Sequence, residues 1–333
     1  MNASLVKLLH LLADGEFHSG SIVGEALGVS RTAVWKHLQK LALMGLSAES
    51  VKGKGYRLVG GLEMLSHAKI TCGLKTLAAA ELSAVDVLLE TASTNAVAAS
   101  HVFSSAAKGY ACLAEYQQAG RGRRGRQWVS PFGHNIYLSV VWQFDGGVAQ
   151  LEGLSLAVGV VVANVLAGFG LSDAQLKWPN DILLQGRKLG GVLLEMSGDP
   201  AGVCQVVVGI GLNVRMPADA AIDQPWASIA EQLPNISRNQ LAAELLNQLA
   251  EMLASFHLKG FSAYRDTWQD LDAYVGRSVV VTSGQRALEG VAAGVCDNGA
   301  LRLQADGEEH TIHGGEVSLR LAEGVEQGLG DVS

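Results

Sequence analysis

The chain has 333 residues, of which 48% are hydrophobic and 17% are charged. This length exceeds one ordinary domain and the apolar content suits a packed core, so the composition excludes a disordered chain. The formal net charge is −7, yet residues 1–60 carry seven basic and four acidic side chains. A basic head on an acidic body is typical of a nucleic-acid-binding module joined to another domain.

Two features bear on where the protein works. The four cysteines lie far apart with no CxxC spacing, which argues against a zinc ribbon or a disulfide scaffold and predicts a cytoplasmic location. Residues 154–171 are uncharged and just long enough to cross a membrane. They include Ser155, Asn164 and three glycines and have no basic flank, so we expect a buried helix and no membrane partner.

Three helices are predicted within the basic head. The first is indicated by leucines at helical spacing, at positions 5, 8, 9 and 12. The other two are predicted over residues 21–27 and 31–44. Ser30 is suited to cap the start of the third helix, and Gly45 follows its end.

The third helix has an apolar inner face and a polar outer face. Two strands, predicted at 48–51 and 56–59, follow it and enclose a turn with two lysines. A helix-turn-helix followed by a basic hairpin resembles a winged helix-turn-helix, although a helical protein-interaction domain has the same periodicity. We expect DNA contacts from Ser30, Arg31, Thr32, Trp35, Lys36, Gln39, Lys52 and Lys54. Such domains bind paired half-sites, which predicts a dimer on DNA.

Beyond a glycine-containing linker near residues 60–66, strands and helices are mixed. Strands are predicted over 135–144 and 203–208, with a helix over 154–168 between them. Ser237 and Gln240 form a capping-box pattern at the start of a later helix. That helix directs five apolar side chains inward, namely Leu241, Leu245, Leu249, Met252 and Phe256.

The most unusual segment is Gly-Arg-Gly-Arg-Arg-Gly-Arg at residues 120–126. Such a composition does not suit a regular helix or strand. Glycine leaves backbone N–H groups accessible to an anion, and arginine adds charge and paired donors. Because the segment occurs once, we interpret it as an anion-binding loop rather than an RNA-binding arginine–glycine repeat or a solvated loop. It matches neither the P-loop nor the dinucleotide pattern.

Three further motifs carry polar groups after predicted strands. They are Lys-Trp-Pro-Asn-Asp at 177–181, Arg-Lys-Leu-Gly-Gly at 187–191 and Gly-Ile-Gly-Leu-Asn at 209–213. Each alone is a weak indication, since a lysine in a loop is usually just solvated. We expect all three to be loops that join 120–126 in one site for a polyanion.

Together with Ser-Thr-Asn at 93–95 and the sequence around 115–125, these motifs resemble the biotin protein ligase family. With the winged helix the chain is similar to the bacterial bifunctional form, a biotin ligase and biotin operon repressor. The resemblance covers about residues 4–322, and the order of the motifs is highly specific. Departures are small: Gln127 and Val129 occupy positions where relatives often differ. Lipoate ligases share the fold but lack this arginine-rich loop.

The resemblance implies an α+β multidomain fold. A winged helix-turn-helix DNA-binding domain is expected over 1–62, and a catalytic α/β domain with a mixed sheet like that of class II synthetases over 67–272. Short strands separated by glycine turns indicate a small barrel near the end, which the resemblance identifies as an SH3-like domain over 273–323. A polar tail at 324–333 has no family role that we can name.

The resemblance also implies a function. The protein would activate biotin with ATP to biotinyl-5′-AMP and transfer biotin to a lysine of the biotin carboxyl carrier protein of acetyl-CoA carboxylase. It would repress the biotin biosynthesis operon by binding operator DNA as an adenylate-bound homodimer. Mg²⁺ is expected to arrive on ATP, with no metal site in the protein. The alternatives are a ligand-sensing repressor without catalysis and a lipoate-ligase-like enzyme.

Site residues follow from the matching motifs. Lys188, Arg123 and Arg121 are the expected catalytic cations. The biotin site is expected to comprise Ser93, Thr94, Asn95, Gln117, Arg121, Gly122, Arg123 and Lys188. The ATP site is expected to comprise Arg124, Arg126, Trp128, Lys177, Asn180, Asp181, Asn213 and Arg320. Trp128 is suited to stack on adenine, with core packing as the alternative.

Overall fold

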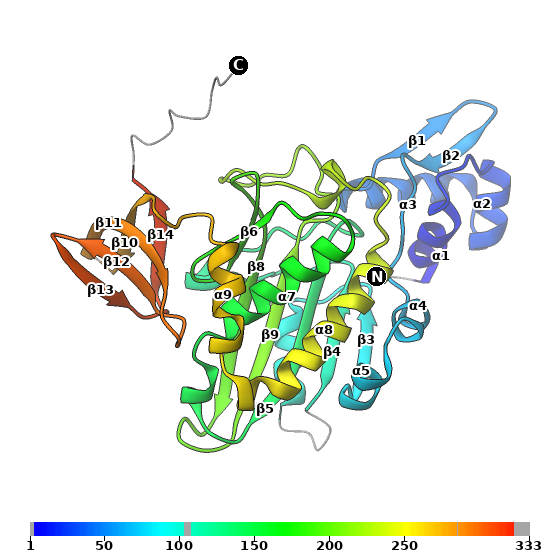
Figure 1. Cartoon of the computed structure of the whole chain (residues 1–333). Coiled ribbons are helices and arrows are strands. Elements are labelled where there is room, and N and C mark those ends of the chain that lie inside the picture. The colour runs from blue at the N-terminus through cyan, green and yellow to red at the C-terminus, as the bar shows by residue number, and fades with distance from the viewer. Residues whose placement is uncertain (1–2, 103–107, 285, 323–333) are drawn as a thin grey trace.

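The computed structural model describes residues 3–102, 108–284 and 286–322, so the predicted polar tail lies outside the described residues. The chain forms a small helical head, a central sheet domain and a β-sheet domain near its C-terminus. The head and the C-terminal sheet lie at opposite ends of the central domain (Figure 1).

The head contains the predicted helices and hairpin. Its elements are α1 (Ala3–Leu12), α2 (Gly20–Leu27), α3 (Arg31–Leu43), β1 (Ala48–Val51) and β2 (Gly55–Leu58). Ser30 caps α3 as expected, since its side chain accepts a hydrogen bond from the Ala33 N–H at 3.4 Å. The four leucines of α1 are buried against Val23, Val34 and Leu38.

The core of the head extends into the central domain. Phe132, from the central domain, is fully buried within the head cluster of α1–α3. Leu62, Leu89 and Tyr116 pack against the same cluster. The head therefore shares a core with the segments on either side of the 120–126 loop.

The central domain is built on a seven-stranded mixed sheet. Its strand order is β3-β4-β5-β9-β8-β7-β6, with β3 and β4 parallel and the other pairs antiparallel. The strands are β3 (Ala84–Leu88), β4 (Tyr110–Ala114), β5 (Ile136–Phe144), β6 (Ala174–Lys177), β7 (Asp181–Leu184), β8 (Arg187–Gly198) and β9 (Cys204–Leu212).

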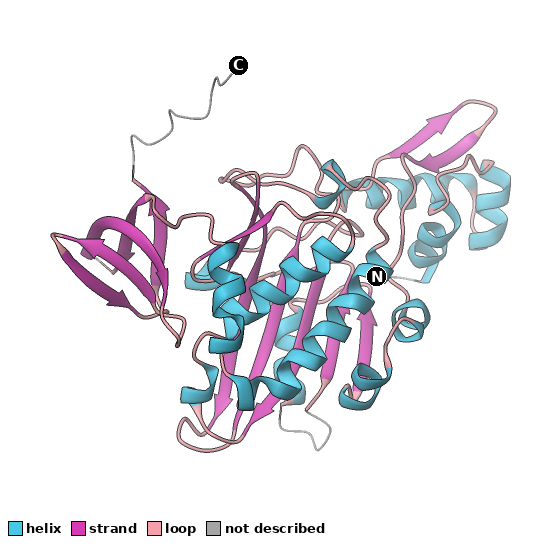
Figure 2. Ribbon diagram, viewed as in Figure 1, coloured by secondary structure: helices cyan, strands magenta, loops and turns pink. Residues whose placement is uncertain are grey.

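Two layers of helices cover the sheet (Figure 2). One face packs against α7 (Leu154–Gly168) and α8 (Arg238–Lys259). The short α4 (His67–Cys72) and α5 (Thr76–Glu81) lie alongside α8, and α9 (Ser262–Asp270) packs between α7 and β11 (Arg286–Val295) of the C-terminal sheet. The opposite face carries α6 (Thr94–His101), which buries Ala98 against Val141 of β5 and Val207 of β9. Short 3-10 turns lie at Arg123–Gly125, Val148–Leu151 and Ile229–Glu231.

The apolar helix is a core element, as its sequence predicted. Val148–Gly168 is long and apolar enough to cross a membrane, but eleven residues of α7 are buried in the domain core. The later helix, α8, also forms as expected. Ser237 caps it by accepting from the Gln240 N–H at 3.3 Å, and all five predicted apolar side chains are buried.

Two motifs that we expected to be loops are parts of strands. Residues 187–191 begin β8, and Gly209–Leu212 belong to the end of β9, which is longer than the predicted 203–208 strand. Arg187, Lys188, Gly190 and Gly191 pair with β7, and residues 209–212 pair with β5. The two segments also meet each other, with Gly191 opposite Gly211. The glycines there leave space above the sheet rather than forming turns, because a Cβ on Gly211 would lie 2.5 Å from the Trp128 ring.

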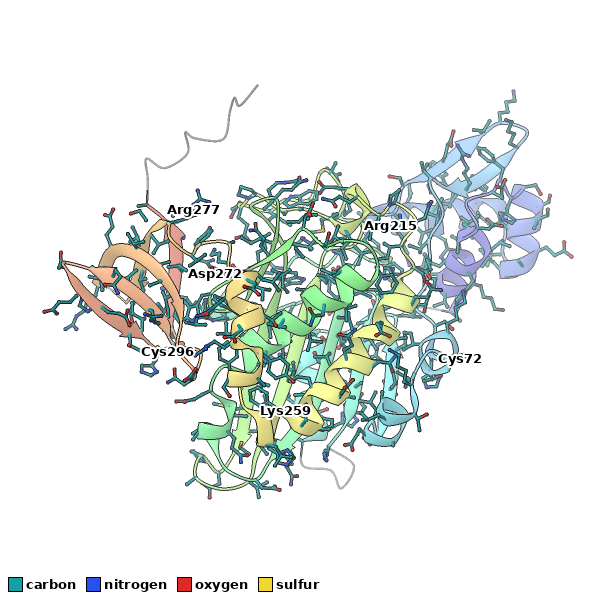
Figure 3. All side chains as sticks on the ribbon, in the orientation of Figure 1. Cys72, Arg215, Lys259, Asp272, Arg277 and Cys296 are labelled. Carbon is teal, nitrogen blue, oxygen red and sulfur yellow. The ribbon has the colours of Figure 1, made fainter. Side chains whose placement is uncertain are left out.

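The C-terminal part is a five-stranded antiparallel sheet of order β13-β12-β11-β10-β14. Its strands are β10 (Ser278–Ser283), β11 (Arg286–Val295), β12 (Leu301–Ala305), β13 (Glu308–Ile312) and β14 (Val317–Leu321). It contacts the central domain where the indole N–H of Trp178 donates to the Gly299 carbonyl at 3.0 Å. The labelled Asp272 and Arg277 lie where the chain crosses between these parts (Figure 3).

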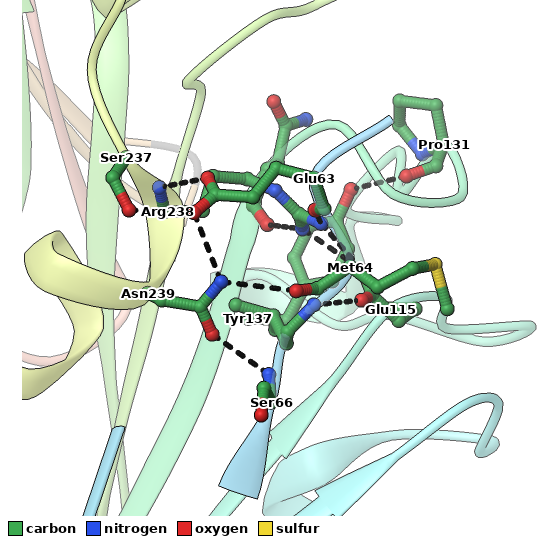
Figure 4. A network of polar contacts seen from close by, with 11 residues as sticks. Glu63, Met64, Ser66, Glu115, Pro131, Tyr137, Ser237, Arg238 and Asn239 are labelled. Carbon is green, nitrogen blue, oxygen red and sulfur yellow. Dashed lines mark hydrogen bonds and ion pairs between the residues drawn. The ribbon is translucent and has the colours of Figure 1, made fainter. Parts of the chain in front are cut away.

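A buried polar network fixes the segment between head and central domain (Figure 4). The Arg238 guanidinium donates to Glu115 at 2.8 Å, and both side chains are 1% exposed. Glu115 also accepts from the Leu65 N–H. Glu63 accepts from the Ser237 hydroxyl and the Arg238 N–H, both at 2.5 Å. The predicted linker is thus anchored to the start of α8.

Candidate active site

A cavity of about 380 Å³ opens on the α6 face of the central sheet. It is bounded by the 120–128 segment, the ends of β6 to β9 and the β14 edge of the C-terminal sheet. Its lining brings together most of the predicted site residues: Ser93, Thr94, Asn95, Gln117, Arg121, Gly122, Arg123, Arg124, Arg126, Trp128, Lys177, Asn180, Asp181, Lys188 and Arg320. A volume of this size suits a small organic ligand.

The arginine-rich segment forms a tight hairpin over the cavity. The Gly122 N–H donates to the Arg126 carbonyl at 2.7 Å, and the Trp128 N–H donates to the Gly120 carbonyl at 2.8 Å. At the tip, Arg124 has a left-handed backbone with φ of 57°, which is unusual outside glycine. Arg124 and Arg126 are exposed.

Two lysines and one carboxylate form the charged centre of the cavity. Lys188 Nζ lies 2.5 Å from Asp181 Oδ1, and Lys177 Nζ lies 3.4 Å from Oδ2. Burial alone would raise the pKa of Asp181, but the two ammonium groups outweigh it and the net pKa lies below its usual value. Burial lowers the pKa of Lys177, Asp181 opposes that shift, and Lys188 adds to it.

Arg123 joins three parts of the site. Its guanidinium donates to Asn180 Oδ1 at 3.0 Å, to the Val317 carbonyl at 3.0 Å and to the Gly315 carbonyl. Burial lowers the pKa of Arg123, while the nearby Asp181 raises it. These contacts hold β14 at the cavity, where Arg320 lines one wall.

The other end of the cavity is neutral and rich in hydrogen-bonding groups. Gln117 Oε1 accepts from both the N–H and the hydroxyl of Thr94, at 2.9 and 3.1 Å. The Ser139 hydroxyl lies 2.8 Å from Thr94 Oγ1 and 2.6 Å from Asn95 Oδ1. Gln117 Nε2 donates to Ser130 at 3.1 Å. These groups are oriented by one another before any ligand arrives.

Trp128 forms part of the boundary between the two ends. Its ring lies against the backbone of Gly211, and Lys188 Nζ is 5.7 Å from the ring centroid. The indole N–H is buried and has no hydrogen-bond partner among the described residues. A buried donor in this state, at a cavity, is suited to a ligand acceptor.

Asn213 is the predicted site residue that the described cavity does not include. It is 3% exposed, and its amide donates to the carbonyls of Lys188 and Ala227 at 3.3 and 3.2 Å. It therefore ties the end of β9 to the segment after Pro225, and its contact with a nucleotide stays a prediction.

Several lining residues were not predicted from the sequence. Asp223, Gln224 and Pro225 form one rim of the cavity, and the Pro225 carbonyl accepts from the Lys188 N–H at 3.0 Å. This segment has neither periodicity nor a recognised motif, so the sequence carried no signal for it. Ser139 and Ser130, which contact the lining residues Thr94, Asn95 and Gln117 from behind, were also missed, because a serine within or beside an apolar strand has no local signature.

The head presents a second candidate surface. Thr32, Trp35, Lys36 and Gln39 are all exposed on one face of α3, and Trp35 is 50% exposed. Lys52 and Lys54 are exposed at the β1–β2 turn. Ser30 serves as the helix cap, and the side chain of Arg31 lies outside the described residues. This is a helix with a basic hairpin beside it, as groove-reading domains have.

Among the described residues, no group of three or more His, Cys, Asp or Glu side chains could hold a metal ion. The four cysteines are free, with Cys112 and Cys204 buried. The labelled Cys72 and Cys296 lie on opposite sides of the molecule (Figure 3).

Fold and site together define a ligase-type catalytic domain joined to a DNA-binding head. Residues 88–213 match the Biotin/lipoate A/B protein ligase family, residues 5–57 match an HTH domain, and residues 274–320 match the Biotin protein ligase C terminal domain. The biotin protein ligase from Aquifex aeolicus, solved in complex with biotin and ATP, is 28% identical with a TM-score of 0.62. The match covers 72% of this chain and 99% of that one.

Curated relatives narrow the assignment. The chain is 41% identical to the bifunctional ligase/repressor BirA of Escherichia coli (strain K12), over 97% of this chain and 99% of the relative. It is 31% identical to BirA of Bacillus subtilis (strain 168), over 92% and 95%. The chain belongs to the family of bifunctional biotin ligase/repressors. The predicted family, fold class and class of enzyme are confirmed.

Proposed function

We propose that the protein activates biotin with ATP, forming biotinyl-5′-AMP, and transfers biotin to a lysine of a biotin carboxyl carrier protein. The observation that carries this proposal is the two-ended cavity. One end collects arginines and lysines, and the other offers neutral donors and acceptors. Biotin has a carboxylate at one end and an uncharged ureido ring at the other, so the cavity matches both biotin and a nucleotide phosphate.

The first step joins two anions. An oxygen of the biotin carboxylate attacks the α-phosphorus of ATP, the bond to the β-phosphate breaks, and pyrophosphate leaves. Two unit charges 4 Å apart repel by about 4 kcal/mol at an effective dielectric constant of 20. Lys188, Arg121 and Arg123 line the cavity where such charge must be offset. Lys188 is the proposed central cation, since it lies between Asp181 and the Trp128 ring.

The second step breaks the mixed anhydride. The neutral amine of the acceptor lysine attacks the biotinyl carbonyl, AMP leaves, and the new amide loses its extra proton to solvent. The anhydride also reacts with water, so the 120–128 hairpin above the cavity is suited to exclude water until the acceptor arrives.

Binding roles follow the two ends. Ser93, Thr94, Asn95 and Gln117 are proposed to hold the ureido ring. Arg124, Arg126, Lys177, Asn180, Asp181 and Arg320 are proposed to hold the nucleotide with Trp128 beside it. Mg²⁺ fits as an ion carried on the triphosphate, because the cavity carboxylate of Asp181 is already paired with two lysines. There it would offset phosphate charge.

The head is proposed to repress a biotin biosynthesis operon. Its exposed α3 face and lysine-bearing turn suit the major groove and the phosphate backbone. Repression by a biotinyl-AMP-bound homodimer at an operator would link biotin demand to transcription. DNA, ATP and the carrier protein are all reached in the cytoplasm, where we propose that the protein works.

Biotin-dependent exchange of labelled pyrophosphate into ATP tests the ligase activity directly. We expect exchange with biotin and none without it. A repressor that only senses biotin would bind it and show no exchange. A lipoate-ligase-like enzyme would show exchange with lipoate instead.

A further inference from the structure

Tyr274 lies in the short segment that joins the central domain to the C-terminal sheet, between the residues Asp272 and Arg277 that are labelled in Figure 3. It belongs to none of the motifs discussed above and is outside the described lining of the cavity. Its ring is partly buried and packs against the main core. One neighbour connects it to the site, because Lys177 Nζ lies 5.7 Å from the centroid of the Tyr274 ring.

The backbone around Tyr274 is fixed to the end of β6, where Lys177 is the last residue. The preceding residue, Leu176, forms hydrogen bonds with this segment through both its N–H, at 2.7 Å, and its carbonyl, at 2.9 Å. The Asp272 carboxylate closes the turn by accepting from the Tyr274 N–H at 2.9 Å. The strand that carries Lys177 and the segment that carries Tyr274 are therefore held side by side.

The two lysines of the charged centre have the same kind of surroundings. Both ammonium groups contact the Asp181 carboxylate. Each also lies 5.7 Å from the centroid of an aromatic ring, which in the case of Lys188 is Trp128. The face of such a ring is negative and attracts a cation within about 6 Å. Asp181 is closer to Lys188, at 2.5 Å, than to Lys177, at 3.4 Å, so Lys177 depends more on its ring.

An aromatic ring suits this position because it attracts the ammonium group without neutralising it. A second carboxylate would cancel the charge of Lys177, whereas the ring leaves two lysines against one carboxylate in the cavity. Burial opposes the charged form of Lys177 and lowers its pKa, and the ring favours that form. The ring thus preserves a positive charge that a phosphate group can use.

We propose that Tyr274 is a positioning residue whose ring holds the Lys177 ammonium group where it meets a phosphate of ATP. The role in ATP binding rests on the proposed function, whereas the hold on Lys177 does not. Tyr274 therefore favours the binding of ATP without touching the nucleotide.

Acetylation of Lys177 tests this hold without any ligand, because acetic anhydride reacts only with the neutral amine. In the ligand-free protein, Tyr274→Leu should speed acetylation of Lys177 by about two- to fivefold, because a ring that favours the ammonium form is lost. Mass spectrometry of the peptides measures the rate at each lysine. Lys108, which lies 4.9 Å from the centroid of the Trp142 ring, is the internal reference and should react at its wild-type rate.

Two further variants separate the charge of the ring from its shape. Tyr274→Phe keeps the ring, and Lys177 should react as in the wild type. Replacing Tyr274 with a trifluorinated phenylalanine keeps the shape but withdraws electrons from the ring face, so acetylation should quicken toward the rate of Tyr274→Leu. Equal rates for the two rings, or no change in Tyr274→Leu, would overturn the proposal. Tyr264→Leu removes another tyrosine that packs on the main core and should leave Lys177 unchanged.

Kinetics test the role in binding. In pyrophosphate exchange, Tyr274→Leu should raise KM for ATP by about two- to fivefold and leave KM for biotin unchanged, and Tyr274→Phe should restore the wild-type value. In a Lys177→Met background, Tyr274→Leu should add no further rise. A rise in KM for both substrates, or an equal effect in both backgrounds, would contradict positioning through Lys177. If the wild-type protein shows no exchange, the ligase proposal fails, while acetylation still decides whether Tyr274 holds Lys177.

Discussion

Lys188 is the residue on which the proposed chemistry most depends. Its ammonium group is 2.5 Å from Asp181 and its side chain is 19% exposed. Lys177 shares the same carboxylate, so Asp181 remains paired if Lys188 is removed. The motif predicted Lys188 from the sequence. The contact of Asp181 with two lysines could be seen only in the structure, because the contact with Lys188 joins neighbouring strands, β7 and β8.

Replacing Lys188 with Met should reduce pyrophosphate exchange by about 10²–10³-fold, because one preformed donor at the developing charge is lost. The fold should persist, since Met has similar bulk and Asp181 keeps Lys177 as a partner. Lys75→Met, which breaks an exposed ion pair with Glu244, is the matched control and should exchange normally. Near-normal exchange by Lys188→Met would remove Lys188 from the mechanism.

At the scale of elements, periodic segments were predictable and glycine-rich strands were not. Apolar spacing placed α1, α3 and α8, because helical periodicity is a local property, and an uncharged apolar run placed α7. Residues 187–191 and 209–213 were expected to be loops, because glycine usually marks turns. In β9, Gly209 and Gly211 instead make room for Asn95 and Trp128, and that need arises from side chains distant in sequence.

The start of α8 also has a role that only the tertiary structure shows. Its cap residue, Ser237, was predictable, but the place of the helix start in the network of Glu63 and Glu115 was not (Figure 4). Burial alone would raise the pKa of Glu63, but hydrogen bonds from Ser237, Asn239 and the Arg238 N–H bring it below the usual value. The network joins the linker, β4 and α8.

Arg238→Met should lower the free energy of unfolding by about 3–5 kcal/mol, because it leaves the Glu115 carboxylate buried without its cation. Urea denaturation would measure this change. Arg302→Met removes one partner of the exposed pair with Glu309 and should lower stability by less than about 1 kcal/mol. Equal effects of the two substitutions would show that the buried network contributes no more than a surface pair.

At the scale of the whole molecule, the head and the central domain share a hydrophobic core. Phe132 belongs to the core of the head, and Leu62 packs on Gly133. We therefore propose that the central unit begins at residue 62 rather than at the expected residue 67. The sequence could not reveal this, because Phe132 looks like any apolar residue of a central domain.

Deleting residues 1–60 should abolish operator binding while preserving adenylate formation, because every proposed catalytic residue lies beyond Ser93. KM for biotin should rise, since exposing Phe132 loosens the segment that follows the 120–128 hairpin. Deleting residues 1–66 also removes Glu63 and Leu65 from the buried network and should give a lower thermal midpoint. Equal midpoints for the two truncations would place the boundary at residue 67 after all.

The packing of the head against the central domain also bears on repression. One head with net charge +3 over residues 1–60 makes few phosphate contacts, and non-specific binding of such modules lies at about 10⁻⁴–10⁻⁶ M. Specific repression therefore requires two heads at a fixed spacing. Biotinyl-AMP would order the hairpin, which leads directly into the Phe132 segment, so occupancy of the cavity would be coupled to the head that packs on that segment.

Biotinyl-AMP should accordingly tighten both dimerisation and operator binding, by about 5–150-fold if the coupling is of ordinary size. Sedimentation measures the first effect and DNA titration at one fixed salt concentration measures the second. A variant with Thr32→Ala and Lys36→Ala should dimerise like the wild type and lose the operator, because these side chains are exposed on α3. By thermodynamic linkage, biotinyl-AMP must then bind the dimer more tightly than the monomer, to the extent that it tightens dimerisation. Equal affinities with and without the adenylate would exclude it as the corepressor while leaving the ligase activity in place.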